Sequence, residues 1–374
     1  MKILHLIYTN GISGAEKHLL SLLPGLKSKG IDCHLIIVCQ PTFYLSLKEF
    51  AQKFIEKNIV TIVIASKRNI SLKTLQLINR HLLKHEIPIL HSHLVRSDIM
   101  GALIKEFFNK KVFLISTKHG YKEKVMFDYG KKDFKITKDF LYYVTKYVFS
   151  KTNANLAVSK YIVDLFINLK LTTKLFPVVH HGIDISYNFL NEKKSNGFEI
   201  IIVGRIEILK GQIYVIEVLP KILKYFPECK LTIVGNGSYE ETLKILVNKL
   251  KINENVSFLG FQKDPYTLIA NADLIIIPSV AEAFGLVFIE AMALKTPIVA
   301  FDVPAGNEIL TQKKTAMLSP VFDENVLAEN ILFLLSDKVE SNRIAENAFL
   351  AYKENFTTEI MIKNTANFYK NLTF

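Results

Sequence analysis

Two glutamates flank a glycine where a loop gives way to a helix, in the segment SVAEAFGLVFIEAMA at 279–293. On one continuous helix, Glu282 and Glu290 would lie about 12 Å apart along the axis and could not share one small target. If the helix begins near Gly285, each carboxylate can hold the hydroxyls of a different ring, and the free amides of the helix start face an anion such as phosphate. The alternative is an acidic capping residue followed by a surface glutamate.

Two cations flank an earlier turn from strand to helix, in the segment VGRIEILKG at 203–211. After Gly204, the guanidinium of Arg205 can donate to two phosphate oxygens, and Lys210 adds a mobile point charge. Both charges would help a nucleoside diphosphate to leave. Alone, such a pair is often plain surface chemistry, but together with the loop at 279–293 it predicts a site for a diphosphate.

A third turn contains Gly235 and Gly237, in the segment VGNGSYEE at 234–241. Small residues here would let the backbone approach a nucleotide. The six-position dinucleotide fingerprint is absent, which disfavours NAD binding. Ser238 and Glu241 have the spacing of a capping box, so an ordinary helix start is the alternative.

The first strand ends in a similar turn, GISGAE at 11–16. Here Gly14 would keep the loop thin, so that an acceptor and the donor phosphate both reach a cleft. The alternative is again a cap, made by Ser13 and Glu16.

One histidine, His119, closes a strand and is followed by a glycine that suits a turn pressed against a ligand. A lone histidine is more often structural or solvated, but a strand end favours a catalytic role. Four other histidines lie near strand ends in pairs that lack a third ligand in the sequence. They are interpreted as core or cleft-lining residues and not as a metal site: His91, His93, His180 and His181.

Short β-branched runs alternate with helical patterns along the whole chain, which predicts parallel strands with helices on both faces. Strands are expected at 3–8, 34–38, 60–64, 88–91, 112–116 and 155–158, and again at 199–203, 230–234, 256–259, 273–277 and 297–300. The polar stretch at 185–197 predicts a linker. Helices at about 325–335, 341–354 and 358–370 follow the last expected strand. In such open sheets, ligands bind beyond the carboxyl ends of the strands.

The composition suits two globular domains, with 374 residues, 49% of them hydrophobic and 22% charged. Three scattered cysteines argue for reduced thiols in the cytoplasm and against a disulfide framework or a zinc site. The opening apolar run is too short for a signal peptide, and no run is long enough to span a bilayer.

The net charge is +12, and lysines concentrate in one stretch of the first half. Such a stretch attracts anionic lipid headgroups, nucleic acid or phosphorylated substrates, and a solvated face is the alternative. A helix within it carries Phe140, Leu141, Val144, Tyr147 and Val148, which favours core packing over a membrane anchor. The lysines are Lys105, Lys110, Lys111, Lys118, Lys122, Lys124, Lys131, Lys132, Lys135, Lys138, Lys146 and Lys151.

The second half, roughly 199–318, resembles the donor domain of the retaining glycosyltransferases of family 4 with the GT-B fold. The resemblance rests on the turns at 204–211 and 234–237, on Ala272-Asp273 leading to Pro278-Ser279, and on the segment from Glu282 to Glu290. The first half is similar more loosely, through 11–16, 91–93 and 179–184. Three positions depart from the family pattern: Lys295, Ala305 and His181.

The resemblance implies an α/β fold of two Rossmann-like doubly wound domains facing an interdomain cleft. The N-terminal acceptor domain would be 1–190, the nucleotide-sugar domain 191–355, and a helix at 356–374 would pack back on the first domain. Arg205 and Lys210 would hold the diphosphate, Glu282 the transferred sugar and Glu290 the ribose, while His119 would contact the donor sugar. The remaining expected donor-binding residues are Gly14, Gly204, Gly235, Gly237, Ala283, Phe284, Gly285 and Leu286.

The function expected on this resemblance is retaining transfer of a sugar from a nucleotide-diphosphate donor to an acceptor hydroxyl, with no metal and no cofactor. The acceptor would be a bacterial cell-surface polysaccharide, lipopolysaccharide or lipid-linked glycan. The enzyme would be cytoplasmic, with a peripheral contact to the anionic inner face of the membrane and no nucleic-acid partner. Two alternatives stay open, a sugar-nucleotide epimerase of the same architecture and a non-catalytic membrane-associated scaffold.

Overall fold

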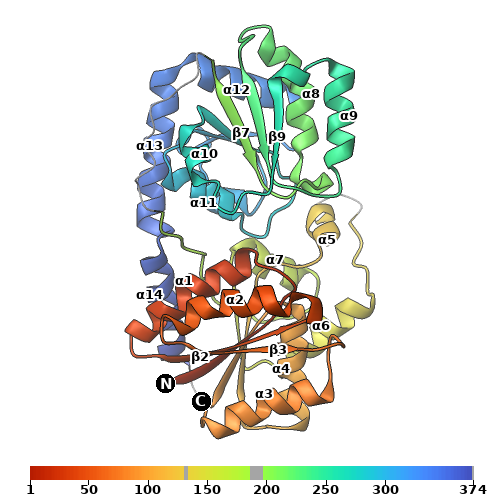
Figure 1. Ribbon diagram of the computed structural model, residues 1–374, viewed down its shortest axis with the longest axis vertical. Helices are drawn as coiled ribbons and strands as arrows, with labels where there is room; N and C mark the ends of the chain where they lie inside the picture. Colours follow the sequence, from red (N-terminus) through yellow and green to blue (C-terminus); the bar gives the residue numbers. More distant parts are fainter. Residues whose placement is uncertain (130–133, 186–196, 373–374) are drawn as a thin grey trace. The chain divides into compact units, whose positions relative to one another are not determined.

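The computed structural model describes residues 1–129, 134–185 and 197–372. Most of the expected linker, 186–196, lies outside the described residues, as do Lys131 and Lys132 of the basic stretch. The chain divides into two compact units. Unit 1 comprises Met1–Lys122, Asp128–Gly182 and Thr358–Phe374, and unit 2 comprises Glu123–Phe127 and Ile183–Thr357. Each unit is a parallel sheet with helices on both faces (Figure 1).

Unit 1 has a six-stranded parallel sheet in the order β3-β2-β1-β4-β5-β6. Every strand lies where the alternation of apolar runs predicts it. The bounds are β1 Lys2–Tyr8, β2 Asp32–Cys39, β3 Val60–Ala65, β4 Ile89–His93, β5 Phe113–Lys118 and β6 Ala154–Ala157. The central strands are buried on both faces, which is why they are recognisable as largely apolar runs.

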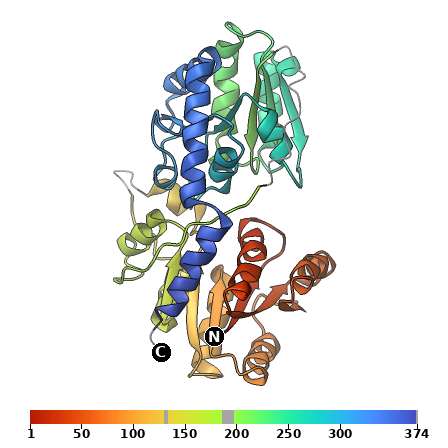
Figure 2. The same cartoon turned by 90° about the vertical axis from the view of Figure 1, so that its left-hand side faces the viewer.

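Helices cover both faces of this sheet. Helices α1, α2 and α14 share one hydrophobic core with it, and α3, α4 and part of α6 share the other. Figure 2 shows α14 lying along the sheet of unit 1. The bounds are α1 Gly14–Ser28, α2 Tyr44–Ile55, α3 Leu72–Lys84, α4 Val95–Phe107, α6 Phe140–Lys151, α7 Lys160–Asn168 and α14 Thr358–Lys370.

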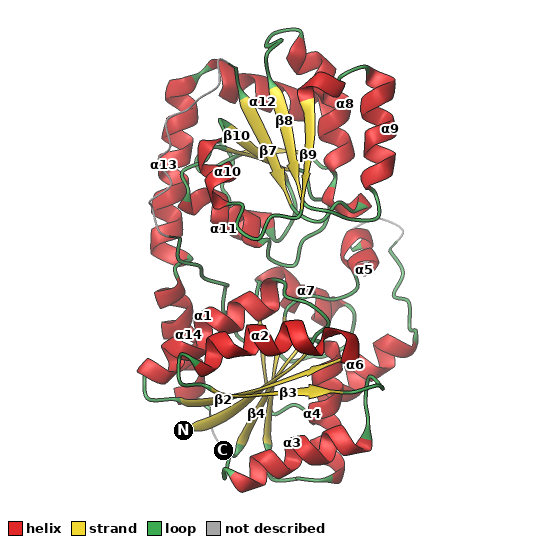
Figure 3. Cartoon of the chain, viewed as in Figure 1, coloured by secondary structure: helices red, strands yellow, loops and turns green. Residues whose placement is uncertain are grey.

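Unit 2 repeats this architecture with the strand order β12-β11-β10-β7-β8-β9. Figure 3 shows β7, β8 and β9 ending at one edge of the sheet, where the loops gather. The strands are β7 Glu199–Val203, β8 Lys230–Val234, β9 Val256–Gly260, β10 Leu274–Ile277, β11 Ile298–Phe301 and β12 Met317–Ser319. The helices are α5 Glu123–Asp128, most of which segregates here, α8 Gln212–Leu223, α9 Glu240–Leu250, α10 Tyr266–Asn271, α11 Leu286–Ala293, α12 Glu324–Ser336 and α13 Lys338–Asn355.

The prediction that the last helices follow the last strand at 297–300 misses one strand, β12. This strand has three buried residues that pair with β11, too short a run to show a period in the sequence. The two-domain Rossmann-like fold is otherwise confirmed. No helix in the described parts of the chain is long and apolar enough to cross a membrane.

Candidate functional site

Three loops of unit 2 meet at the carboxyl edge of the sheet. They follow β7, β8 and β10, which are neighbours in the strand order. The backbone N–H of Ile206 donates to Asn236 O at 2.9 Å, and that of Val280 donates to Leu209 O at 3.0 Å. These bonds join the loops at 204–211, 235–239 and 278–285. The structure therefore brings together the three segments that the sequence singles out.

Glycines make this convergence possible. At Gly235 (φ +136°), a Cβ would lie 1.9 Å from the carbonyl oxygen of Gly204, and at Gly237 it would lie 2.1 Å from Ile206 O. At Gly211 (φ +72°), it would lie 1.9 Å from Pro278 O. A side chain at any of these positions would force the loops apart. In the described structure these glycines therefore serve loop packing.

The Lys210 ammonium and the Glu282 carboxylate, which both have predicted roles in donor binding, lie together. Lys210 Nζ donates to Glu282 Oε1 in an ion pair whose side chains are 22% and 14% exposed. Lys210 ends a short 3₁₀ turn after β7, and Glu282 lies in the loop after β10. The pair therefore bridges two loops at the carboxyl edge, and an incoming diphosphate would compete with Glu282 for the ammonium.

Arg205 is placed differently from Lys210. Its guanidinium is exposed and pairs with the carboxylate of Glu123 on α5. The backbone carbonyl of Arg205 accepts from Gln212 Nε2 at 2.8 Å, which fixes the loop while the side chain extends outward. Arg205 and Lys210 are thus held on one loop, each with a carboxylate partner.

Helix α11 begins where the sequence predicts, with Gly285 at its N-cap in the left-handed region (φ +90°). A Cβ there would lie 2.6 Å from the ring of Phe288, so this position requires glycine. Glu282 is therefore not the capping residue of the alternative interpretation. Leu286 is the first residue of the helix. In the loop before it, Phe284 is buried and Ala283 is partly buried.

Glu290 is not the surface residue that the alternative interpretation requires. It is 8% exposed within α11, and its charge helps to raise the pKa of the Tyr266 hydroxyl, although burial is the larger cause. A carboxylate this deep in a short apolar helix needs a polar partner. Its burial at the end of the sheet distinguishes it from ordinary helix-surface glutamates.

The predicted capping box at Ser238 and Glu241 is wrong. Helix α9 begins at Glu240, and its N-cap Tyr239 has no side-chain cap. Ser238 Oγ instead donates to Glu207 Oε2 at 2.9 Å, and Glu241 pairs with Lys244. The serine thus ties the loop after β8 to the loop after β7.

The cap at the start of unit 1 is confirmed. Glu16 accepts from the backbone N–H of Ser13 at 2.7 Å and from its hydroxyl at 2.7 Å, and Glu16 is 1% exposed. Gly14 is the first residue of α1. The capping explanation accounts for this turn without a ligand.

Six histidines gather on the face of the unit 1 sheet that α1 and α14 cover. Residue His5 on β1 is in register with His91 on β4, and His93 follows two positions later on the same face. Hydrogen bonds join His5 Nδ1 to His93 Nε2 at 3.0 Å and His93 Nδ1 to His119 Nε2 at 3.1 Å. His119 thus stands at the end of a chain of imidazoles. The six residues are His5, His18, His91, His93, His119 and His181.

This cluster is anchored at its other end by α14. The Tyr369 hydroxyl lies 2.5 Å from His91 Nδ1, and Thr117 Oγ1 lies 2.7 Å from His91 Nε2. His18 on α1 lies 2.8 Å from His181, nitrogen to nitrogen. The interpretation of His91 and His93 as core residues is confirmed, since both are at most 1% exposed.

Burial keeps these imidazoles neutral. It lowers the pKa of His119 to about 4, with a smaller contribution from the Lys118 charge, and it lowers the pKa of His5 to about 3. At neutral pH, His119 can therefore donate or accept a hydrogen bond but carries no charge. Within the described parts of the chain, His119 Nδ1 and His5 Nε2 have no hydrogen-bond partner.

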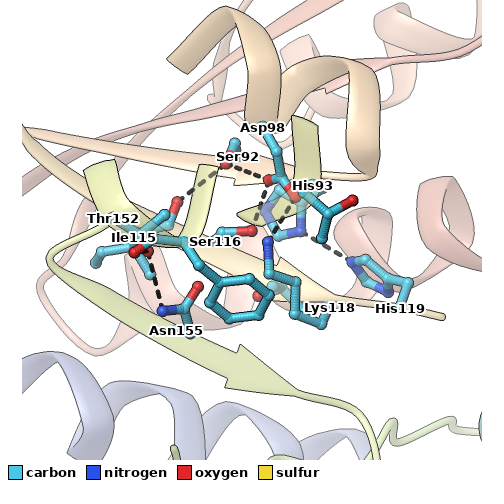
Figure 4. Close-up of polar contacts among 12 residues, drawn as sticks. Ser92, His93, Asp98, Ile115, Ser116, Lys118, His119, Thr152 and Asn155 are labelled. Atoms are coloured by element: carbon cyan, nitrogen blue, oxygen red, sulfur yellow. Dashed lines mark hydrogen bonds and ion pairs between the residues drawn. The ribbon is translucent and has the colours of Figure 1, made fainter. Parts of the chain in front are cut away.

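A buried ion pair supports the end of β5, directly before His119 (Figure 4). Lys118 Nζ lies 2.8 Å from Asp98 Oδ2, and both side chains are 5% exposed. The other oxygen of Asp98 accepts from Ser92 Oγ and Ser116 Oγ, each at 2.6 Å. Lys118 is therefore a core residue and does not belong to a solvated basic face.

A cavity of about 310 Å³ in unit 1 opens beside this pair. His119, Asp98 and Lys118 line it together with apolar side chains such as Leu141 and Phe166. An apolar pocket with a few polar groups is the usual form of a small-molecule site.

Sequence reasoning missed His5, His18 and Asp98. The residues His91 and His93 show the spacing of one strand face, but the register that adds His5 comes from strand pairing far along the chain. Strand pairing therefore places a third histidine, His5, beside His91 and His93, although nothing in the sequence near them indicates it. One ring nitrogen from each of His5, His91 and His93 lies within 4.8 Å of the others. The same holds for His34, His81 and His85.

Two family models match consecutive parts of the chain. Residues 12–187 match Glycosyltransferase Family 4, and residues 187–350 match Glycosyl transferases group 1. Their boundary at residue 187 lies a few residues after Gly182, where unit 2 takes over from unit 1.

Curated relatives agree. An uncharacterized glycosyltransferase of Methanocaldococcus jannaschii, MJ1607, is 32% identical over 208 residues, which are 52% of this chain and 53% of that protein. The match thus spans about half the length of this relative. N-acetyl-alpha-D-glucosaminyl L-malate synthase of Bacillus anthracis is 26% identical over 76% of this chain and 75% of its own length.

Among solved structures, HepE of Anabaena in complex with UDP superimposes with a TM-score of 0.81 at 21% identity, covering 100% of both chains. That likeness establishes the two-domain fold. The two family models follow one another along residues 12–350. The chain therefore belongs to the glycosyltransferases that they describe, Glycosyltransferase Family 4 and Glycosyl transferases group 1.

Proposed function

We propose that this protein transfers a glycosyl group from a nucleotide-diphosphate sugar to an acceptor hydroxyl, with retention of the anomeric configuration. The observation that carries the proposal is the Lys210–Glu282 pair at the carboxyl edge of unit 2, where α11 begins. An ammonium, helix amides and a carboxylate at one edge suit a pyrophosphate linked to a sugar. HepE is solved with UDP, so a uridine diphosphate donor is the first to test.

In the proposed step, the bond from the anomeric carbon to the β-phosphate oxygen breaks, and a bond to the acceptor oxygen forms on the same face. The acceptor proton passes to the departing phosphate oxygen, so the products are the glycoside and the nucleoside diphosphate. Lys210 and Arg205 stabilise the negative charge of the leaving group, together with the amides that open α11. Glu282 orients the sugar, and its role as a covalent nucleophile is the less favoured alternative.

This assignment requires Lys210 to exchange partners. When the diphosphate binds, the ammonium turns from Glu282 to the phosphate, and Glu282 becomes available to the sugar hydroxyls. Glu290 is assigned to the ribose and His119 to the donor sugar, on the family resemblance. No metal ion and no cofactor are needed in the proposed step, because protein cations and amides stabilise the leaving group.

The test is the release of nucleoside diphosphate by Lys210→Ala, with Lys224→Ala as the matched control. Lys224 is an exposed lysine at the end of α8, away from the loops. Loss of one leaving-group contact predicts a decrease in kcat of about 10²–10³-fold for Lys210→Ala and an unchanged rate for the control. Near-normal turnover of Lys210→Ala would remove Lys210 from the mechanism.

Two further measurements separate the alternatives. Proton NMR of the product gives the anomeric configuration, and an inverted product excludes the retaining step. Incubation with donor alone distinguishes an epimerase, which needs no acceptor and would yield an isomerised nucleotide sugar.

We also propose that the acceptor is a bacterial surface glycan or its lipid-linked precursor and that the enzyme works at the cytoplasmic face of an anionic membrane. Support comes from α6, where Phe140 is 84% exposed and Tyr143 is 59% exposed beside the exposed Lys138 and Lys146. Part of this helix packs into the core, where Val148 is buried, while Phe140 and Tyr143 stay exposed. Basic and aromatic side chains together favour an anionic interface.

Sedimentation with vesicles tests the membrane contact. Binding to phosphatidylglycerol vesicles that exceeds binding to phosphatidylcholine vesicles, and that decreases in Phe140→Ala, supports it. Equal binding to both vesicles, or none, contradicts it.

A further inference from the structure

A second histidine cluster lies on unit 1, on the face that α3 covers. His34 is the third residue of β2, and His81 and His85 lie four positions apart at the end of α3, on the same side of the helix. The ring centroids are 4.4–5.1 Å apart. One ring nitrogen of each residue lies within 4.8 Å of the others.

This cluster is far from the edge that carries the loops before α1 and α5. Residue His34 is near the start of β2, and α3 runs antiparallel to the strands, so that its last turn reaches their amino ends. Ligands of open α/β sheets bind at the carboxyl ends. The cluster therefore has no part in sugar transfer, and the proposed metal-free step is unaffected.

The orientation of His34 suits metal binding. Its Nδ1 lies 2.9 Å from His81 Nε2, inside the cluster, and its Nε2 lies 3.8 Å from the Asp32 carboxylate. A ligating histidine usually directs its second nitrogen to a carboxylate, which fixes the ring and increases its basicity. At 3.8 Å the Asp32 carboxylate is beyond hydrogen-bond distance, and a small approach would bring it into this role.

Access distinguishes this cluster from the His5, His91 and His93 group. That group is at most 1% exposed, and its members already bond to Tyr369 and to one another. In contrast, His85 is partly exposed, and the Asp32 side chain is 47% exposed. An ion can reach the second cluster from solvent.

We propose that His34, His81 and His85 bind a divalent transition-metal ion such as Zn²⁺, with a fourth position left to water. Three imidazoles with a borderline metal are a common ligand set. At Zn–N distances of about 2.0–2.1 Å, tetrahedral ligands lie about 3.3 Å apart, so the His34 and His81 rings need only separate slightly. The ion would tie β2 to the end of α3 and stabilise this side of unit 1.

Three lysines near the cluster, Lys2, Lys27 and Lys84, oppose a bound cation. The affinity must therefore come from the imidazole nitrogens, and removing one of them should have a large effect. Since His85 lies at a helix end and is partly exposed, its substitution is the one least disruptive to the fold.

The experiment titrates Co²⁺, as a spectroscopic substitute for Zn²⁺, into the full chain carrying no affinity tag. We expect saturable visible ligand-field absorption with one ion per chain and a higher Tm with Zn²⁺. His85→Gln should weaken binding at least about tenfold, and Asp32→Asn about tenfold through the loss of its contact to His34. The matched control is Arg80→Gln, an exposed residue of the same helix, which should bind as the original chain does.

Each outcome of the titration either supports or overturns the proposed metal site. Absence of saturable binding, or the same affinity in His85→Gln and Asp32→Asn as in the original chain, overturns the proposal. The Tm of each metal-free variant verifies folding, and Asp32→Asn keeps the test valid if His85→Gln unfolds. Glycosyl transfer should be the same in His85→Gln with and without metal, so this test and the test of the proposed function can fail independently.

Discussion

The buried Asp98–Lys118 pair should be strongly coupled. Replacing Lys118 by Met leaves a carboxylate that is 5% exposed, and among the described residues the hydroxyls of Ser92 and Ser116 remain as its donors. Replacing Asp98 by Asn leaves a buried ammonium facing an amide, with the ring of Phe149 at 4.7 Å as its remaining attraction. Either change isolates one charge in the core of unit 1.

The magnitude follows from burial. Removing one partner of a buried pair costs about 3–5 kcal/mol, because the remaining charge is desolvated without compensation. In the double variant Asp98→Asn/Lys118→Met, both charges are absent, and the amide oxygen of Asn can still accept from the two serines. Its cost should be about 1–3 kcal/mol, well below the sum of the two single costs. The coupling energy should therefore be at least about 3 kcal/mol.

Urea unfolding followed by far-UV circular dichroism measures these differences. The chain has no tryptophan, so intrinsic tryptophan fluorescence cannot report on it. Where the two units unfold separately, the transition of unit 2 serves as an internal reference. Single variants that each cost less than about 1 kcal/mol, or costs that simply add, would show that the pair behaves like a surface salt bridge.

Two further predictions concern stability. Burial lowers the pKa of His5 to about 3 and of His119 to about 4, whereas unfolded histidines titrate near 6.5. The unfolded state therefore binds more protons below about pH 6.5. The free energy of unfolding should decrease by up to about 1.4 kcal/mol per pH unit for each histidine as the pH falls toward about 4. A Tm that stays constant from about pH 7 to about pH 5 contradicts this prediction. Gly235→Ala should cost at least about 2 kcal/mol more than Gly260→Ala in urea unfolding. Both glycines have positive φ, but a Cβ at Gly235 would lie 1.9 Å from Gly204 O, whereas at Gly260 no described atom beyond the two neighbouring residues lies within 4 Å. Equal costs would show that the loops after β7 and β8 can separate freely.

The fold was predictable because its strands are buried on both faces. A parallel strand covered by two helix layers is apolar at most positions, so after their first residues β1 and β2 are visible as apolar runs that only His5 and His34 interrupt. The strand β12 was not predictable, since three residues are too few to show a pattern. Turn chemistry was predictable in part, because Ser13 and Glu16 form a local cap, whereas Ser238 binds a residue 31 positions away.

The candidate site was predictable only as separate turns. The sequence places Lys210 and Glu282 at strand ends, but their ion pair depends on β7 and β10 being neighbours. The burial of Glu290 could not be predicted either, because spacing along a helix does not indicate which side of the helix is covered. The histidine chain needs strand register, which joins His5 to His91 across 86 positions of sequence.

The last helix gives the synthesis of this protein a particular order. Unit 1 contains α14, whose Met361 and Tyr369 complete the core beneath α1, and the Tyr369 hydroxyl bonds to His91. The main segment of unit 2 is translated between α14 and the rest of unit 1. A nascent chain therefore carries all six strands of the first sheet, but one part of the core on its α1 face stays incomplete until translation passes residue 370. Unit 2 has no such delay, so we expect it to reach a protease-resistant state on the ribosome before unit 1 does.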